Sequence, residues 1–342
     1  MRVLVTGGSG FIGSHLVEYL LAEQHQVFNV DKLTYAANAQ FQLSTNANGQ
    51  YQHFQADICD AVALRHIFEQ AQPDIIFHLA AETHVDRSID SPASFIHSNM
   101  TGTFQLLEAT RRYWGQLAET KKADFRLLHI STDEVFGDMA GSEHPAHEQS
   151  IYRPSSPYSA SKAASDHLVM AWHRTYGLPV MVTHCSNNYG PRQHTEKLIP
   201  LVISNALQGK PLPIYGNGEQ IRDWLYVDDH VSALLSLMKN GNIGESYNIG
   251  GLNQTRNIDV VLQIVRLLDE FVPPFALKIS SYADLIRFVE DRPGHDVRYA
   301  IDAAKIVRET GWSPQFDLEQ GLRKTVQWYL HQWPISAATK VV

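Results

Sequence analysis

Short apolar runs alternate with amphipathic stretches through the first half of the chain. The apolar runs occupy 3–5, 27–30, 75–79, 127–130 and 180–185, and amphipathic stretches lie near 14–23, 61–70, 94–113 and 157–175. Nearly continuous apolar strands separated by helices are typical of a parallel sheet that is covered on both faces. The pattern therefore predicts an α/β fold with a Rossmann-like, doubly wound parallel sheet.

The pattern changes after about residue 186, where turn residues cluster at 186–192, 209–213 and 215–218. Such punctuation separates short elements and predicts a smaller C-terminal α+β lobe. We expect a Rossmann domain over 1–186, the smaller lobe over 187–330 and a loose tail over 331–342. A helical stretch at 228–238 and a strand at 246–249 are predicted to return to the main sheet, near 228–250.

Composition and charge narrow the class of protein. The chain has 342 residues, 44% hydrophobic and 19% charged, with a formal charge of −8. An acidic chain is a poor binder of nucleic-acid backbones, and no apolar run is long enough for a bilayer. The N-terminus enters a strand without a secretory signal, so Cys59 and Cys185 are expected to be buried thiols in a reducing cytoplasm. We expect a cytoplasmic protein with neither nucleic-acid nor membrane partners.

Three glycines follow the first predicted strand at once. Gly7, Gly10 and Gly13 form a G-x-x-G-x-x-G motif between that strand and a helix. Missing side chains permit a tight turn and close approach of a pyrophosphate, and the helix N-terminus directs amide groups at it. This context predicts a dinucleotide cofactor.

The second strand ends at Asp31, whose carboxylate can accept hydrogen bonds from the adenosine ribose and would repel a 2′-phosphate. NAD is therefore favoured over NADP, although Lys32 next door weakens the inference. Asp57 and Ile58 follow the third strand and could reach the adenine, with a structural role for Asp57 equally open. Small residues at 79–81 would let the chain pass close to the nicotinamide ribose.

Tyr158 and Lys162 lie four residues apart in a predicted helix, behind Pro157 and a capping Ser155 or Ser156. At this spacing both side chains occupy one helix face. A lysine ammonium and an oxidised nicotinamide ring both favour phenolate, so Tyr158 could accept a hydroxyl proton while hydride leaves the same carbon. Thr132, at the end of the preceding strand, could bind the same hydroxyl.

Asp133 and Glu134 follow Thr132 directly. Because strand side chains alternate faces, both can address one substrate only if the strand ends near Ser131 and a turn takes over. Close carboxylates split their titrations, so one can act as an acid and the other as a base. The alternative interpretation is that both are solvated loop acids that cap a helix.

His144 and His147 suggest a metal site at first sight. Pro145 between them breaks helical spacing, and no cysteine or acidic cluster completes a ligand set. No metal is expected.

The motifs together resemble the extended short-chain dehydrogenase/reductases. The segments that carry the resemblance are 7–14, 80–88, 131–137, 158–162, 185–191, 196–200, 221–227 and 291–296. The similarity spans about 1–330 and is closest to the NAD-dependent sugar-nucleotide 4,6-dehydratases, because Thr-Asp-Glu at 132–134 separates them from the 4-epimerases. Phe136 and Ser98 depart from the tyrosine and threonine that are common in the family.

The resemblance implies roles for matching residues. Thr132 would orient the glucosyl 4-hydroxyl, Tyr158 would be its base, Asp133 the acid and Glu134 the second base, with Lys162 on the nicotinamide ribose. The implied NAD-binding set is Gly7, Gly10, Phe11, Ile12, Gly13, Asp31, Lys32, Leu33, Thr34, Asp57, Ile58, Leu79, Ala80, Ala81, Ser98, Tyr158, Lys162 and Asn188. The implied substrate-binding set is Thr83, Thr132, Asn187, Lys197, Leu198, Pro213, Ile214, Tyr215, Arg222, Asn257, Arg292 and His295.

The implied reaction converts dTDP-glucose to its 4-keto-6-deoxy product and water, with oxidation at C4, elimination across C5 and C6, and hydride return to C6. Arg222 and Arg292 suit a diphosphate, since a guanidinium pairs with two phosphate oxygens. The alternatives are another dehydratase, a 4-epimerase or a decarboxylase of the same superfamily, and a non-catalytic NAD sensor. Family relatives dimerise through a four-helix contact, so 94–113 and 157–175 predict a homodimer. The base preference is not fixed by these residues.

Overall fold

A parallel sheet forms the centre of the computed structural model, which describes residues 1–38, 41 and 49–332. Within these residues the sheet has seven strands in the order β10-β6-β5-β4-β1-β2-β3. The strands are β1 (Arg2–Thr6), β2 (Gln26–Asp31), β3 (Tyr51–Gln55), β4 (Ile75–His78), β5 (Arg126–Thr132), β6 (Val180–Cys185) and β10 (Ser246–Ile249). All pairings between them are parallel. The predicted fold class is confirmed.

The strand sequences explain why the sheet is buried on both faces. The central strands β4 and β6 are buried at every position, whereas the edge strand β3 exposes Gln52 and Gln55. The chain runs outward from β1 through β2 to β3, then returns to β4 on the other side of β1. Loops after β1 and β4 therefore diverge, which opens a crevice at the carboxyl ends of the strands where ligands bind in such folds.

Helices cover the two faces of the sheet. On one face, α1 (Phe11–Ala22), α10 (Val227–Asn240) and α12 (Ala304–Thr310) share an apolar cluster with the strands. On the other, α3 (Ala61–Ala71), α6 (Thr103–Gly115) and α8 (Pro157–Tyr176) do the same. The short α7 (Glu119–Asp124) precedes β5. The stretches 228–238 and 246–249 lie within α10 and β10 against this sheet, and α12 joins them.

The stretch 94–113 is not the single amphipathic segment that its pattern predicts. After α4 (Val85–Asp90) it divides into α5 (Pro92–Phe95), a π-helical stretch η1 (Ile96–Gly102) and α6. The side chain of Asn99 accepts a hydrogen bond from the amide of Glu82 and donates to its carbonyl, so η1 is tied to the loop after β4. Short π-helical stretches such as η1 are frequent beside functional sites.

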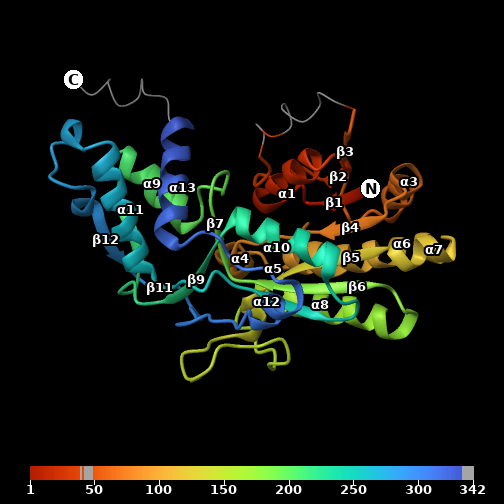
Figure 1. Ribbon diagram of the computed structural model, residues 1–342. Helices are drawn as coiled ribbons and strands as arrows, with labels where there is room; N and C mark the ends of the chain where they lie inside the picture. Colours follow the sequence, from red (N-terminus) through yellow and green to blue (C-terminus); the bar gives the residue numbers. More distant parts are fainter. Residues whose placement is uncertain (39–40, 42–48, 333–342) are drawn as a thin grey trace.

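The second lobe has its own apolar core. It contains a three-stranded sheet of β7 (Asn187–Tyr189), β9 (Ile221–Tyr226) and β11 (Gln254–Arg256), and a pair formed by β8 (Leu212–Tyr215) and β12 (Ile286–Val289). Helices α9 (Leu198–Leu207), α11 (Asn257–Phe271) and α13 (Leu318–Gln332) surround these strands, with short turns at η3 (Phe275–Leu277) and η4 (Tyr282–Leu285). This lobe lies on the left in Figure 1 and the parallel sheet on the right.

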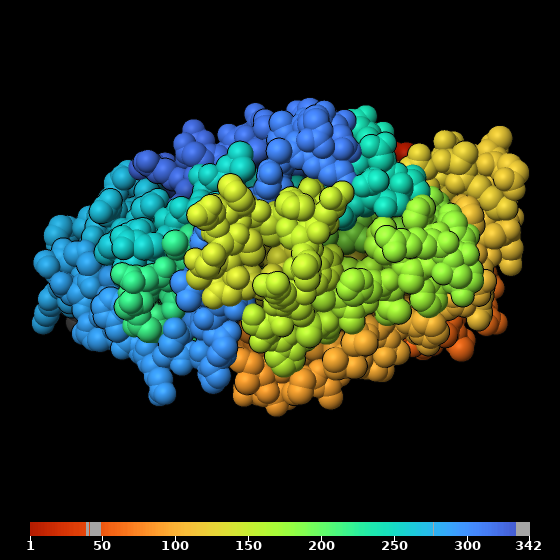
Figure 2. Space-filling model, turned by 90° about the horizontal axis from the view of Figure 1, so that it is seen from below, coloured from red at the N-terminus to blue at the C-terminus, as the bar shows by residue number. Residues whose placement is uncertain are grey.

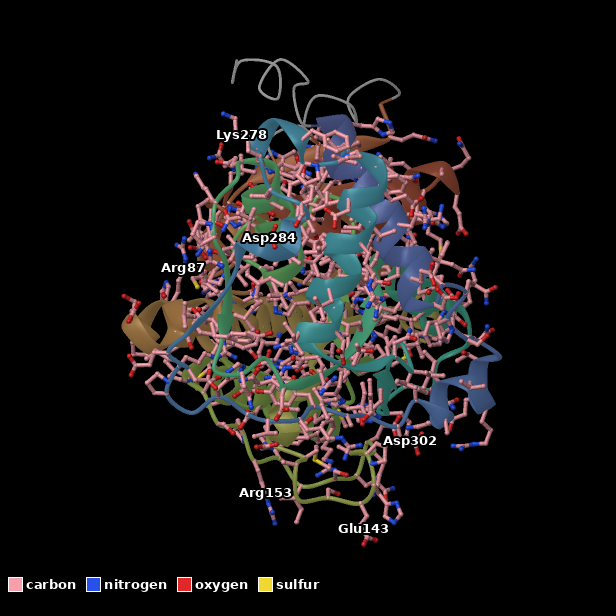
Figure 3. The ribbon with its side chains drawn as sticks, turned by 90° about the vertical axis from the view of Figure 1, so that its left-hand side faces the viewer. Arg87, Glu143, Arg153, Lys278, Asp284 and Asp302 are labelled. Carbon is pink, nitrogen blue, oxygen red and sulfur yellow. The ribbon has the colours of Figure 1, made fainter. Side chains whose placement is uncertain are left out.

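The segment between the 3₁₀ turn η2 (Asp133–Phe136) and α8 lies on the surface between the lobes (Figure 2). Figure 3 shows that its residues Glu143 and Arg153 lie at the opposite end of the molecule from Lys278.

Three further expectations can be compared with the structure. Cys185 is buried, but Cys59 is only half-buried, so the prediction of two buried thiols is wrong for Cys59. Cys59 lies in the loop after β3, where its side chain is partly accessible to solvent. Of the predicted loose tail, 333–342 lie outside the described residues. No described helix is long and apolar enough to cross a membrane.

Candidate active site

One cavity lies over the carboxyl ends of β1, β2, β4 and β5 and extends to the start of the second lobe. Its walls include the glycine turn, the redox pair, the carboxylate pair and the loop that leads into α9. The crevice of the doubly wound sheet thus brings together motifs that are more than a hundred residues apart in the sequence.

The glycine turn fits a dinucleotide. Gly7 has φ of 74°, and a Cβ there would lie 2.7 Å from the amide nitrogen of Ala80. A Cβ on Gly13 would lie 2.1 Å from the carbonyl oxygen of Gly7. Gly10 precedes α1 and provides no side-chain cap, so the amides of the first turn are left for an anion at the positive end of the helix.

Asp31, the last residue of β2, lines the cavity. Its carboxylate accepts hydrogen bonds from the amides of Ser9 and Leu33, at 3.0 and 2.8 Å, which fix its direction. Lys32 donates to Ser98 Oγ at 3.0 Å and lies 3.7 Å from a carboxylate oxygen of Asp57. Since the ammonium of Lys32 is engaged in this way, it does not offset the preference of Asp31 for an unphosphorylated ribose.

The predicted redox pair is held at the start of α8. Ser156 and Ser159 form a capping box, and Pro157 occupies the first turn, as the sequence predicts. Lys162 is buried and its Nζ donates to the carbonyl of Ile130 at 2.8 Å. Burial lowers the pKa of Lys162 and raises the pKa of Tyr158 well above its ordinary value.

The ionisation of Tyr158 departs from the expectation in one respect. After burial, the charge of Glu134 is the next cause that raises the pKa of Tyr158, and the hydroxyl of Thr132 lowers it. The expected lowering by Lys162 is not a main contribution. The carboxylate of Glu134 raises the pKa of Tyr158 because a nearby negative charge disfavours the phenolate.

The carboxylate pair lies in η2, directly after β5. The strand continues through Thr132, one residue further than predicted, and the hydroxyl of Thr132 then accepts a hydrogen bond from the amide of Glu134 at 3.3 Å. The turn replaces strand alternation, so Asp133 and Glu134 both line the cavity. Asp133 is only 3% exposed, which excludes the alternative of a solvated loop acid at that position.

The two carboxyl groups have different electrostatic surroundings. Burial, followed by the charges of Glu134 and Asp223, raises the pKa of Asp133 well above its ordinary value. One oxygen of Asp133 is buried without a hydrogen-bond partner in the described structure. Burial also raises the pKa of Glu134, but nearby cations oppose this shift, namely Lys197, Arg292 and Arg222. Of the two, Asp133 therefore holds its proton more readily than Glu134.

Cations from the second lobe approach the same end of the cavity. Lys197 Nζ donates to the carbonyl of Thr83 at 3.0 Å. Arg222 is buried, donates to the carbonyls of Asp296 and Val297, and lies over the ring of Tyr299. Arg292 Nη1 lies 3.1 Å from Asp86 Oδ1. All three cations lower the pKa of Glu134, so their positive charge acts on this end of the cavity.

The cavity contains most of the predicted ligand-binding residues. From the NAD-binding set, all but Leu33 line it. From the substrate-binding set, its walls include Thr83, Thr132, Asn187 and Lys197. The remaining members of that set lie outside the cavity wall, and they are Leu198, Pro213, Ile214, Tyr215, Arg222, Asn257, Arg292 and His295.

Several of these outer residues have other partners. The side chain of Ile214 packs in the core of the second lobe. His295 Nδ1 lies 2.6 Å from Asp291 and its ring meets that of Tyr215 edge-on. The Oδ1 of Asn257 is buried without a partner in the described structure.

The cavity also contains polar residues that belong to neither of the two implied binding sets. Among them are Glu82, Ser186, Gln193, His194 and Glu196. The carboxylate of Glu196 lies within 3.8 Å of His84, Arg87 and His194 and accepts from the hydroxyl of Tyr35. Glu196 lies beside Lys197 in the segment 196–200 that carries the family resemblance, and this position was the signal that could have identified it. Figure 3 shows Arg87 at the edge of the molecule.

The GDP-mannose 4,6 dehydratase family model matches residues 4–325. The chain belongs to this family. It is 58% identical over 331 residues to the dTDP-glucose 4,6-dehydratase of Haemophilus influenzae, covering 96% of this chain and 98% of the relative. It is also 58% identical to dTDP-glucose 4,6-dehydratase 1 of Escherichia coli, covering 96% and 93%.

Solved structures agree with this family assignment. The dTDP-glucose 4,6-dehydratase DesIV of Streptomyces venezuelae, solved with NAD, superposes with a TM-score of 0.86 at 42% identity, over 97% of each chain. UDP-glucose 4-epimerase of Thermotoga maritima has a TM-score of 0.83 at 30% identity, over 97% of this chain and 99% of the other. The fold is thus shared by proteins named for different reactions.

Proposed function

We propose that the chain is an NAD-dependent dTDP-glucose 4,6-dehydratase. The observation that carries the proposal is the pair Asp133 and Glu134, which lines one cavity with Thr132 and Tyr158 and whose two members have different electrostatic surroundings. The relatives of similar length that are 58% identical carry the same activity in their names.

The first step is oxidation at C4 of the glucose ring. NAD would be held on the glycine turn and would supply the hydride acceptor for this step and the hydride donor for the last one. Thr132 orients the 4-hydroxyl, and Tyr158 accepts its proton. Because burial raises the pKa of Tyr158, the phenolate needs a positive charge nearby. Lys162, next on the same helix face, contributes one such charge.

The second step is loss of water across C5 and C6. The ketone at C4 acidifies the proton on C5, and Glu134 removes it as the ionised base. Asp133, held protonated, gives a proton to the departing C6 hydroxyl. Hydride then enters at C6 and a proton returns to C5, so the product is a 4-keto-6-deoxy sugar nucleotide. The substrate loses one water and its net oxidation state does not change.

A panel of nucleotide-glucose donors tests this function. The purified chain should convert dTDP-glucose to a product lighter by one water, detected by mass. A product of unchanged mass with inverted C4 would instead indicate a 4-epimerase, and loss of carbon dioxide from a sugar acid would indicate a decarboxylase. The carboxylate pair favours dehydration over both.

A non-catalytic NAD sensor is the alternative from another class. The intact Thr132, Tyr158 and Lys162 in one cavity favour catalysis, since a sensor has no use for a base on a substrate hydroxyl. Transient absorbance of reduced nicotinamide after mixing with dTDP-glucose distinguishes the two. A sensor would bind NAD without this signal.

The domain division, assembly and location follow as further proposals. We infer an NAD-binding domain over 1–186 with return elements near 228–250, and a nucleotide-sugar lobe over 187–330.

The exposed apolar side chains of Ile96, Phe104 and Tyr176 on the outer side of η1, α6 and α8 support a homodimer through these helices. Sedimentation should give a dimer, and Phe104→Asp should shift it to monomer. The free thiols Cys59 and Cys185 support a reducing, cytoplasmic location.

A further inference from the structure

Asn188 belongs to the cavity wall but has no step in the reaction described above. It lies in β7, which pairs with β9 in the sheet of the second lobe. It lines the cavity together with Ser186 and Gln193, and it is a member of the NAD-binding set that the resemblance implies. A side-chain amide presents a donor at one end and an acceptor at the other, so the direction in which it points decides what it can bind.

The hydrogen bonds of Asn188 determine that direction. One end of its amide donates to the carbonyl oxygen of Ser186 at 2.9 Å. A backbone carbonyl can only accept, so this end is the nitrogen and the opposite end is Oδ1. The main-chain carbonyl of Asn188 accepts from the side chain of Gln193 at 2.8 Å. The backbone and one end of the side chain are therefore both held at the wall.

His230, on α10, is the partner of the amide oxygen. Its ring is buried, and its Nδ1 lies 2.8 Å from Asn188 Oδ1. Because Oδ1 accepts, Nδ1 must carry the proton. The Nε2 atom is buried with no partner in the described structure, so a second proton would leave a stranded N–H donor there. The ring is therefore neutral, in agreement with burial, which lowers the pKa of His230 to about 3.

This hydrogen bond joins the two parts of the molecule. Helix α10 packs on the parallel sheet through Val231 and Leu234, whereas Asn188 belongs to the sheet of the second lobe. His230 is not among the described residues that line the cavity. The oxygen of the amide thus points toward α10, and its NH₂ group lies on the side of Ser186, which does line the cavity.

We propose that His230 is a positioning residue for NAD: by donating to Asn188 Oδ1, it holds the amide with its NH₂ group toward the cavity as a donor for the cofactor. The inference deepens the proposed function and rests on the place of Asn188 in the NAD-binding set. An amide turned over would set its oxygen against the carbonyl of Ser186 and would present an acceptor where a donor is needed.

The test follows the release of NAD from the purified holoenzyme into a large volume of buffer. His230→Leu removes the donor, so NAD should leave about tenfold faster, as expected for the loss of one hydrogen bond. His230→Asn is the conservative variant, because its amide nitrogen can take the place of Nδ1. It should restore release to within about threefold of the wild-type rate. If His230→Leu does not accumulate as folded protein, His230→Phe keeps a ring without a donor and takes its place.

The matched control lies on the same helix. Ser232→Ala removes the hydroxyl that accepts from Trp312 Nε1 and donates to the carbonyl of Asp229. It disturbs α10 without changing the partner of Asn188, so NAD should leave at the wild-type rate. Faster release from Ser232→Ala, equal to that from His230→Leu, would show that any perturbation of α10 has this effect and would overturn the specific role of His230.

A double-variant cycle separates positioning from a general structural role. Asn188→Ala should itself speed NAD release, and His230→Leu should then add nothing, because the amide on which it acts is gone. Release at the wild-type rate in His230→Leu, no restoration by His230→Asn, or additive effects in the cycle would overturn the proposal. None of these measurements uses dTDP-glucose, so an inactive wild type would refute the dehydratase function and leave the role of His230 standing.

Discussion

Asp133 and Glu134 are adjacent in the sequence and both line the cavity, but nearby cations act mainly on Glu134. Lys197, Arg292 and Arg222 oppose the rise of the pKa of Glu134. The pKa of Asp133 is raised by burial and, after that, by the negative charges of Glu134 and Asp223. The turn that follows β5 creates this difference, because it points consecutive side chains at different neighbours of one cavity.

Glu134→Gln tests the role of this residue as the base. Glutamine keeps the shape but cannot accept the C5 proton, so kcat for dehydration should fall by about 10²–10⁴-fold. Oxidation at C4 does not use Glu134, so reduced nicotinamide should still form on mixing with dTDP-glucose and should then persist. Stopped-flow absorbance and product mass measure the two steps. Dehydration at the wild-type rate would refute the assigned role.

Asp133→Asn tests the buried acid through stability as well as catalysis. The folded-state pKa of Asp133 is raised above that of the unfolded chain. At pH values between the unfolded-state and folded-state pKa of Asp133, the folded protein binds more protons than the unfolded chain. The contribution of Asp133 to stability therefore falls as pH rises from about 4 through the folded-state pKa. The asparagine variant should lose this dependence and gain about 1–3 kcal/mol at neutral pH, while dehydration is lost.

Asp138→Asn is the control for this measurement. Burial tends to raise the pKa of Asp138, but hydrogen bonds from the amides of Val297, Ala140 and Arg298 outweigh it, so the net pKa is lowered. Stability from this group is present above the unfolded pKa and is lost as pH falls, so its variant should be destabilised at neutral pH. Urea unfolding at a series of pH values measures the change in stability of Asp133→Asn and of Asp138→Asn, and the two changes should have opposite signs. Destabilisation of Asp133→Asn at neutral pH would contradict the argument.

Gly13→Ala should prevent cofactor binding. The added Cβ would lie 2.1 Å from the carbonyl oxygen of Gly7 and 2.7 Å from the Cα of Gly8, and both atoms belong to the backbone of the phosphate turn. We expect at least about a tenfold loss of NAD per chain after purification, measured by absorbance of the denatured supernatant. Gly115→Ala, at the end of α6 with nothing within 4 Å, is the matched control and should retain NAD. Full NAD content in the Gly13 variant would contradict the fit.

The sequence predicts the parallel sheet and most of the cavity wall, because those features follow from local patterns. A buried strand needs a continuous apolar run, and a phosphate turn needs glycines at fixed spacing. The division of 94–113 was not predictable, because it depends on Asn99 binding the backbone of Glu82 across the fold. The same holds for Glu196, whose partners Tyr35, His84 and Arg87 come from distant segments.

A substitution at Lys197, which has no step of its own in the reaction, should change the pH at which Glu134 ionises. Its ammonium lowers the pKa of Glu134 against the effect of burial. Lys197→Met removes that charge, so the pKa of Glu134 should rise. Since the base must be ionised, the acid limb of kcat for dTDP-glucose dehydration should move to higher pH, by about one unit for a partly buried charge pair.

Lys210→Met is the matched control, because Lys210 is exposed ahead of β8 and does not contribute to the pKa of Glu134. Its acid limb should coincide with that of wild type. The size of the shift in Lys197→Met should also decrease little with added salt, because a buried pair is screened less than a surface pair. An acid limb that stays in place in Lys197→Met would show that Arg222 and Arg292 suffice to hold Glu134 ionised.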